Sequence, residues 1–406
     1  MRKTPSYSSR RAAGRRRAVV PALALATCVT VVAACTTHGE PVAAEPSGTT
    51  ATSSTTTSAA AGSGVVPPPC GAPELAKMSL RQKLAQRLVV GVTGSADARQ
   101  VIKTEKIGGI FIGSWTDMSI LSSGDAATIA KSSSIPVMVT VDQEGGRVSR
   151  LKSLGIDLPS ARSVAASGAS ARQVRAQAKA AGEKMAKLGI TVDFAPVVDV
   201  SDESDDEVIG DRSYSNDPAV VTEYAGAFAR GLQDAGIMPV YKHFPGHGHG
   251  SGDSHTGVVK TPPLSELVES DLVPYRTLLR DPGDAGVMVG HLIVPGLTGP
   301  ETPASISPKA IGMLRTGKGY DGPAFDGVVF SDDLSGMKAI SDKYPIDRAV
   351  LKAFQAGSDI GLWLSTDKVS AVLDTLEAAV KSGNLNAARV DDSVVRILRA
   401  KGVVHC

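Results

Sequence analysis

Aromatic residues are scarce in this 406-residue chain: Phe, Trp and Tyr make up 4% of it, whereas apolar residues as a whole make up 42%. The core must therefore be built from Val, Ile, Leu and Ala, which is typical of parallel α/β proteins whose strands are buried on both faces. A large excess of charge is also missing, since the formal net charge is +2. That balance argues against a nucleic-acid partner.

Charged residues are absent from Ala18 to Ala34, directly after a basic segment that ends at Arg17. This apolar run of about 17 residues is short for a membrane span and indicates an export signal. It ends in Val32-Ala33-Ala34-Cys35, which resembles the lipobox of bacterial lipoproteins. We therefore expect residues 1–34 to be removed and Cys35 to carry lipid. An ordinary secretion signal with an incidental cysteine is the alternative.

Large apolar residues are almost missing from Thr36 to Pro69, where Thr, Ser, Ala, Gly and Pro dominate. Such a segment cannot bury enough surface to offset the entropy of ordering it, so it is expected to be a disordered tether. The predicted organisation is a signal peptide in 1–34, lipidated Cys35 with a tether in 35–69, and one folded domain in 70–406. The protein would be exported and held at the cell membrane, facing the extracytoplasmic space.

Aliphatic runs alternate with amphipathic segments from Cys70 onward. Such strict alternation indicates a parallel sheet, and eight units over about 335 residues favour a single (β/α)₈ barrel over an open doubly wound sheet. No dinucleotide-type glycine loop follows the first strand. The predicted strands are Leu88–Val92, Gly109–Ile112, Val137–Asp142, Thr191–Ala195, Met238–Lys242, Gly286–His291, Gly327–Ser331 and Asp359–Leu364, and the predicted helices include Arg172–Leu188, Pro218–Ala235 and Asp367–Val380.

Cysteine is rare in the folded part, with Cys70 at its start and Cys406 at its end. The two ends of a (β/α)₈ barrel meet where the sheet closes, so we expect a Cys70–Cys406 disulfide, which an exported protein can keep. Two free thiols near frayed termini are the alternative.

Polar residues end several of the predicted strands, where this fold places its active sites. They are Asp142, Lys242-His243, His291 and Asp332-Asp333. Polar side chains at the ends of aliphatic runs are poorly suited to pack in a hydrophobic core, so we expect them to form a functional site.

Three motifs resemble glycoside hydrolase family 3, and more closely its β-N-acetylglucosaminidase branch. They are Val141–Val148 (VDQEGGRV), Lys242–His255 (KHFPGHGHGSGDSH) and Val329–Leu334 (VFSDDL). The resemblance runs from about Leu75 to Arg399 and implies a retaining exo-glycosidase that needs neither cofactor nor metal.

The resemblance places the nucleophile at Asp332, with Asp333 the lesser candidate. A carboxylate suits attack on an oxocarbenium-like centre and later departure. Without the motif, a helix N-cap or an ion pair would explain this aspartate equally well. The following Leu334–Met337 has a glycine where the family often continues Ser-Met, which predicts a looser turn behind the nucleophile.

The resemblance also assigns the general acid/base to His255, with Asp253 as its partner. Imidazole titrates near neutrality and can both give and take a proton, and a neighbouring carboxylate can fix its tautomer. A solvated loop histidine is the alternative. Glycines alternate with small polar residues between His247 and Asp253, so we expect a mobile loop that swings His255 onto bound sugar.

The resemblance also places five residues on the sugar-binding positions of the family, where they would offer hydrogen-bond acceptors or donors at the barrel mouth. They are Asp142, Arg150, Arg212, Lys242 and His243. A hydrolytic metal site is the competing interpretation of the clustered histidines His243, His247, His249 and His255. The chain has no His-Glu-x-x-His motif, which argues against it.

The expected activity is removal of terminal β-linked N-acetylglucosamine from peptidoglycan fragments or related glycans by a monomer, with carbohydrate and, through Cys35, the membrane as its partners. A β-glycoside phosphorylase is compatible with the same site, because an imidazole would not repel phosphate as a carboxylate does. A lipoprotein that binds glycans without cleaving them is the alternative from another class.

Overall fold

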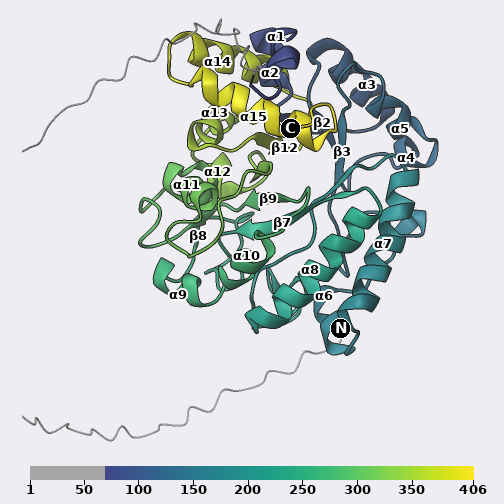
Figure 1. The fold of residues 1–406 in the computed structure, drawn as a ribbon, viewed down its shortest axis with the longest axis vertical. Coiled ribbons are helices and arrows are strands. Elements are labelled where there is room, and N and C mark those ends of the chain that lie inside the picture. Colours follow the sequence, from purple (N-terminus) through teal and green to yellow (C-terminus); the bar gives the residue numbers. More distant parts are fainter. Residues whose placement is uncertain (1–68) are drawn as a thin grey trace, which may run out of the picture. The chain divides into compact units, whose positions relative to one another are not determined.

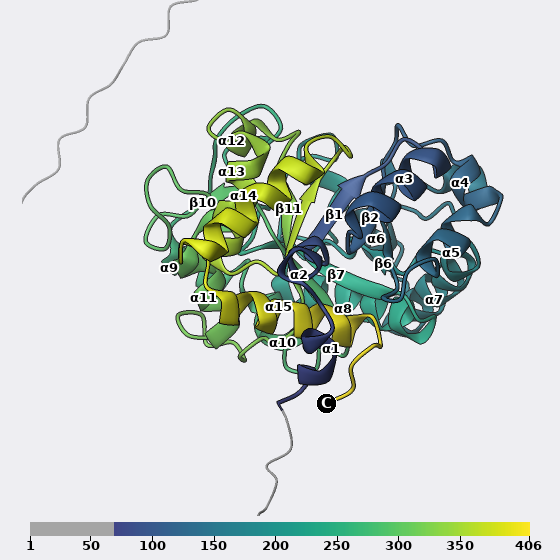
Figure 2. The ribbon, with the colours of Figure 1, turned by 90° about the horizontal axis from the view of Figure 1, so that it is seen from above.

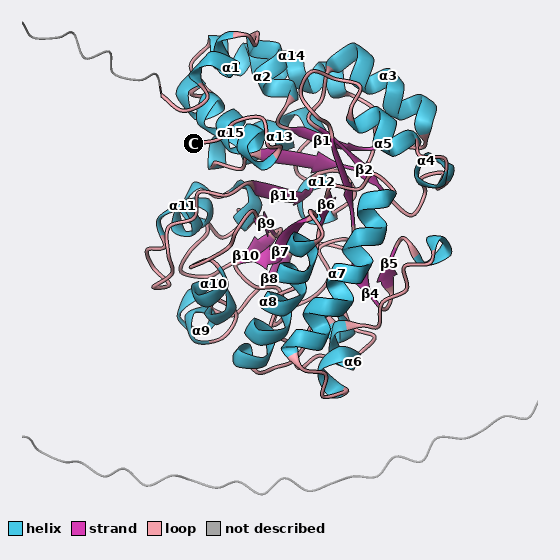
Figure 3. Ribbon diagram, turned by 45° about the vertical axis from the view of Figure 1, so that its right-hand side comes forward, coloured by secondary structure: helices cyan, strands magenta, loops and turns pink. Residues whose placement is uncertain are grey.

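A computed structural model describes residues 69–406. The predicted signal peptide, Cys35 and nearly all of the tether lie outside the described residues. The described part is a closed barrel of eight parallel strands with helices around it (Figures 1 and 3). The barrel strands are β1 Leu88–Gly91, β2 Gly109–Ile112, β3 Met138–Val141, β6 Val192–Asp193, β7 Met238–Phe244, β9 Gly286–Val289, β11 Val329–Asp333 and β12 Ile360–Trp363.

The eight predicted strands all coincide with barrel strands, and β1 closes the sheet by pairing with both β2 and β12. Most strand ends differ from the prediction by one or two residues. Strand β11 extends to include Asp332 and Asp333, whereas His291 lies beyond the end of β9. Four short strands outside the barrel were not predicted, because two- and three-residue pairings have no readable period: β4 Gln143–Gly145, β5 Val148–Ser149, β8 Val259–Lys260 and β10 Leu292–Ile293.

Helices surround the barrel and cover the outer face of its strands (Figure 1). The longer ones are α3 Ser95–Glu105, α7 Ala171–Lys187, α8 Pro218–Asp234, α11 Pro308–Thr316, α13 Ile346–Ala356, α14 Val369–Lys381 and α15 Ala387–Ala400. The shorter ones are α1 Ala72–Ala76, α2 Leu80–Ala85, α4 Ser119–Ser122, α5 Asp125–Ala130, α6 Ala161–Ala166, α9 Leu264–Glu269, α10 Val273–Leu278 and α12 Lys338–Ser341, with 3₁₀ turns η1 Lys152–Leu154, η2 Gly210–Arg212 and η3 Ala304–Ile306. No helix within residues 69–406 is long and apolar enough to cross a membrane.

Aromatic rings fill part of the barrel interior, contrary to the expected all-aliphatic core. Phe111, Phe194 and Phe330 are buried there, with ring centroids 5.9 Å apart for Phe111–Phe194 and 5.3 Å for Phe194–Phe330. Composition gives only an average, and three of the seven phenylalanines are placed where large side chains close the barrel. The layer between strands and helices is rich in Val, Ile, Leu and Ala, but it also buries aromatic side chains such as Phe228 and Phe244, so the all-aliphatic prediction is wrong there too.

A disulfide joins the two ends of the described chain. Cys70 and Cys406 are bonded with their Cα atoms 5.9 Å apart, and Figure 2 shows α1 beside the C-terminus. The bond closes a loop of 336 residues, the case in which the chain-entropy model gives a large effect.

Replacing Cys406 by serine is expected to lower the free energy of unfolding by roughly 2–5 kcal/mol, because the unfolded chain gains the freedom of an open loop. Chemical denaturation of both proteins without reductant measures the difference. With reductant, wild type and variant should unfold at the same denaturant concentration. A difference that persists under reduction would contradict the account.

Candidate active site

A polar cavity of about 270 Å³ lies at the C-terminal ends of the barrel strands. Its walls come from residues far apart in sequence, such as Asp142 after β3, Lys242 in β7 and Asp332 in β11. All five predicted sugar-contact residues line this polar cavity, together with Asp332 and His255. The barrel therefore brings the predicted site residues to one opening.

Asp332 and Asp333 are adjacent but differ in how their carboxylates are held. Asp333 accepts hydrogen bonds from the Ser335 N–H and hydroxyl, both 2.8 Å, and from the Gly336 N–H, 2.7 Å. Asp332 accepts only one, 2.9 Å from the N–H of Asp333. Within residues 69–406, its other oxygen is left without a hydrogen bond and can face a ligand. Asp332 is thus the residue available for chemistry, and Asp333 shapes the turn.

The surroundings of Asp332 keep it ionised although its side chain is only 6% exposed. Burial alone raises the pKa of this carboxyl, but the imidazoles of His243 and His291 and the charge of Lys242 outweigh burial and hold the pKa below its usual value. Burial, reinforced by the neighbouring Asp332 charge, raises the pKa of Asp333. An ionised, partly unpartnered carboxylate has the properties that a nucleophile needs.

The turn behind Asp332 is tight, so the prediction of a loosened turn at Gly336 was wrong. A Cβ on Gly336 would lie 2.5 Å from the Oδ2 atom of Asp333. The missing side chain lets the Gly336 N–H reach that carboxylate. The glycine therefore permits the close approach that fixes the turn.

His255 faces the polar cavity from the loop after β7. Its Nδ1 lies 2.7 Å from Asp253 Oδ1, which also accepts the His255 backbone N–H at 2.9 Å. The imidazole is 61% exposed, and the contact leaves its Nε2 directed away from Asp253. Asp253 does not line the polar cavity and acts by holding the ring. His255 lines the same polar cavity as Asp332, but a single arrangement of the loop does not test the expected swing, which stays a prediction.

The same loop is anchored at its start by a second histidine–carboxylate pair. His249 Nδ1 lies 2.9 Å from Oδ2 of Asp271, a residue that is fully buried. Gly246 packs against the same aspartate at φ 137°, a conformation that favours glycine. The hydrogen bond to Asp271 raises the pKa of His249, although burial opposes it.

Because the folded-state pKa of His249 is raised, this pair stabilises the protein fully below the unfolded pKa of about 6.5 and less as the pH rises through the folded value. Wild type should therefore exceed His249→Gln in unfolding free energy by more at about pH 5.5 than at about pH 8.5. Denaturant titrations at both pH values measure this. His405→Gln, at the exposed C-terminus, serves as the control, and an equal gap at both pH values would refute the pairing.

Four charged groups form a network in the wall of the polar cavity. Lys242 Nζ lies 2.7 Å from Asp142 Oδ1 and 2.6 Å from Glu144 Oε1. Arg212 donates to both oxygens of Glu144 at 2.8 Å. Burial alone raises the pKa of Glu144, but Arg212 and Lys242 hold it far below its usual range. Arg212 therefore positions Glu144, a residue to which the sequence analysis gave no role.

His243 is oriented by a buried carboxylate that the sequence analysis missed. Asp199 accepts from its Nδ1 at 2.7 Å, and the same carboxylate accepts the backbone N–H groups of His243 and His247 at 3.1 and 2.8 Å. Asp199 is wholly buried. Its position four residues past the predicted fourth strand, Thr191–Ala195, was the available signal, since the loops after barrel strands supply site residues.

Arg150 lines the polar cavity, and no ion pair forms on its guanidinium within the described range. Residues 69–406 also contain no group of three or more His, Cys, Asp or Glu side chains arranged to hold a metal. The clustered histidines pair with carboxylates instead: His243 with Asp199, His249 with Asp271 and His255 with Asp253.

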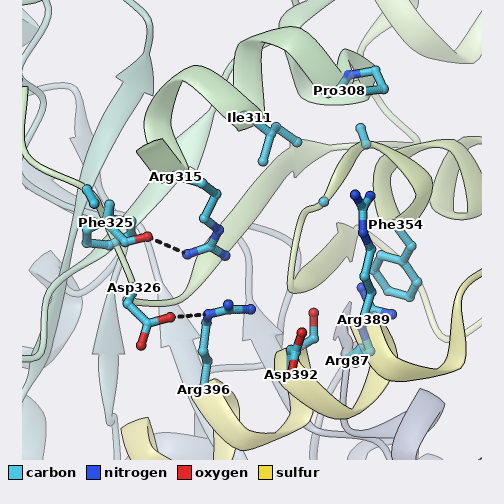
Figure 4. A pocket seen from close by; sticks show the side chains of 15 residues that line it. Arg87, Pro308, Ile311, Arg315, Phe325, Asp326, Phe354, Arg389, Asp392 and Arg396 are labelled. Atoms are coloured by element: carbon cyan, nitrogen blue, oxygen red, sulfur yellow. Dashed lines mark hydrogen bonds and ion pairs between the residues drawn. The ribbon is translucent and has the colours of Figure 1, made fainter. Parts of the chain in front are cut away.

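A larger hollow of about 370 Å³ lies at the other end of the strands (Figure 4). Some of its charged groups are engaged within the protein: Asp326 pairs with Arg396 at 2.7 Å, and Arg315 donates to the carbonyl of Phe325 at 3.1 Å. Arg87 lies 3.7 Å over the Phe354 ring. In this fold the N-terminal end of the barrel serves stability, so the polar cavity is the candidate active site.

Comparisons with known proteins identify the family of the chain. The model of the glycosyl hydrolase family 3 N-terminal domain matches residues 79–400. The beta-hexosaminidase LpqI of Mycobacterium tuberculosis (strain ATCC 25618 / H37Rv) is 58% identical over 335 residues, which span 82% of this chain and 85% of that protein.

Solved structures agree as well. The structure of M. tuberculosis LpqI is matched with a TM-score of 0.79 at 58% identity, over 82% of this chain and 96% of that one. A family 3 β-N-acetylglucosaminidase from Paenibacillus sp. str. FPU-7 is matched with a TM-score of 0.72 at 33% identity, over 80% and 62% of the two chains. With the family model matched over most of its length, the chain belongs to glycosyl hydrolase family 3 and is a glycosidase.

Proposed function

We propose that this glycosidase is a retaining exo-β-N-acetylglucosaminidase in which Asp332 is the nucleophile and the Asp253–His255 pair is the acid/base. One observation supports this most strongly. The partly unpartnered carboxylate of Asp332 and the imidazole of His255 line one cavity, which has the size of a small ligand site.

Each step uses a group that the polar cavity presents. Asp332 attacks the anomeric carbon while His255 gives its proton to the departing glycosidic oxygen, so a C–O bond breaks as the carboxylate ester forms. His255, now neutral, takes a proton from water, and that water displaces Asp332. Asp253 stabilises the cationic imidazole in the states where His255 is protonated. Two inversions give net retention.

The remaining wall is suited to hold the terminal sugar. Asp142 accepts from sugar hydroxyls, whereas Lys242 and Arg150 donate to them. The names of the relatives, β-hexosaminidase and β-N-acetylglucosaminidase, support N-acetylglucosamine as that sugar. We propose terminal β-linked N-acetylglucosamine of peptidoglycan fragments or related glycans as the substrate, and a monomer as the acting form.

Hydrolysis of an aryl β-N-acetylglucosaminide, compared with the aryl β-glucoside, tests the proposal. The first should be cleaved faster and yield free sugar at the same rate with and without phosphate. Sugar phosphate as the main product would instead identify a phosphorylase. Binding of the sugar without turnover of either compound would instead support the alternative of a lipoprotein that binds glycans without cleaving them.

We also propose that the protein is exported and anchored through lipid on Cys35, a residue outside the described part. The apolar run and the small residues before Cys35 support this. Expressed in a bacterium with a lipoprotein export pathway, wild type should partition with membranes and lose this behaviour as Cys35→Ala. An unchanged membrane fraction in the variant would refute the anchor.

A further inference from the structure

Trp115 lies where the polar cavity meets a second hollow. Within residues 69–406 it is one of two large apolar side chains that stay exposed, at 43%. Its indole lines the polar cavity and also a hollow of about 430 Å³, called here the rim hollow. Leu364 borders both as well. The two hollows are therefore contiguous, with an aromatic ring at their boundary. The rim hollow is lined by Thr93, Asp97, Trp115, Leu364, Ser365, Thr366 and Asp367.

The indole is held in place by its own turn. Thr116 Oγ1 accepts the Gly113 N–H at 3.0 Å and donates to the Val92 carbonyl at 2.7 Å. A Cβ on Gly113 would lie 2.3 Å from the Trp115 ring, so the ring packs directly on that backbone. Phe111 supports it with ring centroids 6.0 Å apart. A ring that is already fixed before binding loses little conformational entropy when a ligand stacks on it.

The rim hollow offers acceptors and no cation. Asp97 accepts from the Thr93 N–H at 2.9 Å and from the Thr366 hydroxyl at 2.8 Å, which fixes its carboxylate. Asp367 is exposed, and its backbone carbonyl is tied to the Trp363 indole N–H at 3.3 Å. Neither Lys nor Arg lines this hollow. Hydroxyl, amide and amine donors suit such a lining, whereas a carboxylate would be repelled.

We propose that the rim hollow is the subsite for the leaving-group sugar, with Trp115 as its stacking platform. This inference rests on the proposed function. When a terminal sugar occupies the polar cavity, the next ring must extend beyond its rim, and Trp115 lies where the polar cavity continues. A pyranose places its apolar C–H face on the indole and donates to Asp97 and Asp367. The preferred leaving group is a sugar without a free carboxylate, which in the proposed peptidoglycan fragments means an N-acetylmuramic acid whose carboxyl is in amide linkage to a peptide.

Activity of Trp115→Ala on two substrates tests the platform. One is the β-1,4 disaccharide of N-acetylglucosamine; the other is β-N-acetylglucosaminyl fluoride, whose leaving group has no ring. The ratio of kcat/KM for the disaccharide to kcat/KM for the fluoride should fall by roughly tenfold or more in the variant. Trp115→Phe should restore part of the ratio.

An unchanged ratio in Trp115→Ala would overturn the inference, whether both activities fall together or neither falls. Failure of the wild type to hydrolyse the fluoride at all would instead count against the proposed function. The two failures are therefore distinguishable.

Charge in the rim hollow has its own test. Asp367→Asn should raise kcat/KM for a disaccharide whose second sugar has a free carboxylate, such as N-acetylmuramic acid, by roughly two- to fivefold relative to the neutral disaccharide. The gain should shrink at high salt. Asp374→Asn, an exposed carboxylate of α14 that does not line the rim hollow, is the matched control. No gain, or an equal gain in the control, would refute the charge selection.

Discussion

Replacing Asp332 by alanine is expected to lower kcat for an aryl β-N-acetylglucosaminide by roughly 10⁴-fold or more, because no other group can form the glycosyl ester. The fold should survive, since this carboxylate accepts a single hydrogen bond and its charge opposes that of Asp333. Azide should restore turnover in the variant and yield the α-glycosyl azide, since a small anion attacks from the emptied side.

The control for Asp332→Ala is Asp326→Ala. Asp326 precedes β11, the strand that contains Asp332, and lies at the other end of the barrel. Its carboxylate is exposed and pairs with Arg396 and Arg399. This variant should keep kcat within about twofold of wild type, as is usual for surface substitutions. If purified, folded Asp332→Ala turned over substrate at a near-normal rate, Asp332 could not be the nucleophile.

Replacing His255 by alanine should lower kcat/KM for the neutral disaccharide by roughly 10²- to 10⁴-fold, the range for loss of a general acid. The loss for β-N-acetylglucosaminyl fluoride should be much smaller, because fluoride departs without a proton. Azide should now give the β-glycosyl azide, since it replaces the water that His255 activates. The opposite anomers separate the roles of Asp332 and His255.

Lys260→Ala is the control for His255→Ala, because Lys260 is an exposed residue of β8, the short strand that follows the same loop. It should change both activities by no more than about twofold. Equal losses for the fluoride and the disaccharide in His255→Ala would indicate that His255 holds the sugar or the loop and gives no proton.

The barrel could be predicted because its signal is periodic and local. The eight aliphatic runs locate the strands, and the polar residues that end them converge once parallel strands close into a barrel. Asp142, Lys242 and Asp332 therefore line one cavity as expected.

The partners of these residues could not be predicted in the same way. Glu144 and Asp199 act through contacts with Arg212, Lys242 and His243, and these contacts depend on how loops from different strands meet. Gly336 was misjudged for a related reason. Its effect depends on a carboxylate three residues away that accepts its N–H.

The role of Trp115 could not be predicted either, because the sequence does not show whether a single tryptophan in a loop is buried or exposed. The ring stays exposed because Gly113 and Thr116 hold the turn that presents it. Such a platform is visible only once the backbone is in place.

Mass spectrometry of the enzyme inactivated by a 5-fluoro-β-N-acetylglucosaminyl fluoride shows whether Asp332 forms a covalent bond to the sugar. We expect one glycosyl group, attached through an ester to the peptide that contains Asp332, and no labelling of Asp332→Ala. Inactivation with the sugar on a different residue, or steady hydrolysis of the compound by a path that never labels the protein, would contradict that expectation.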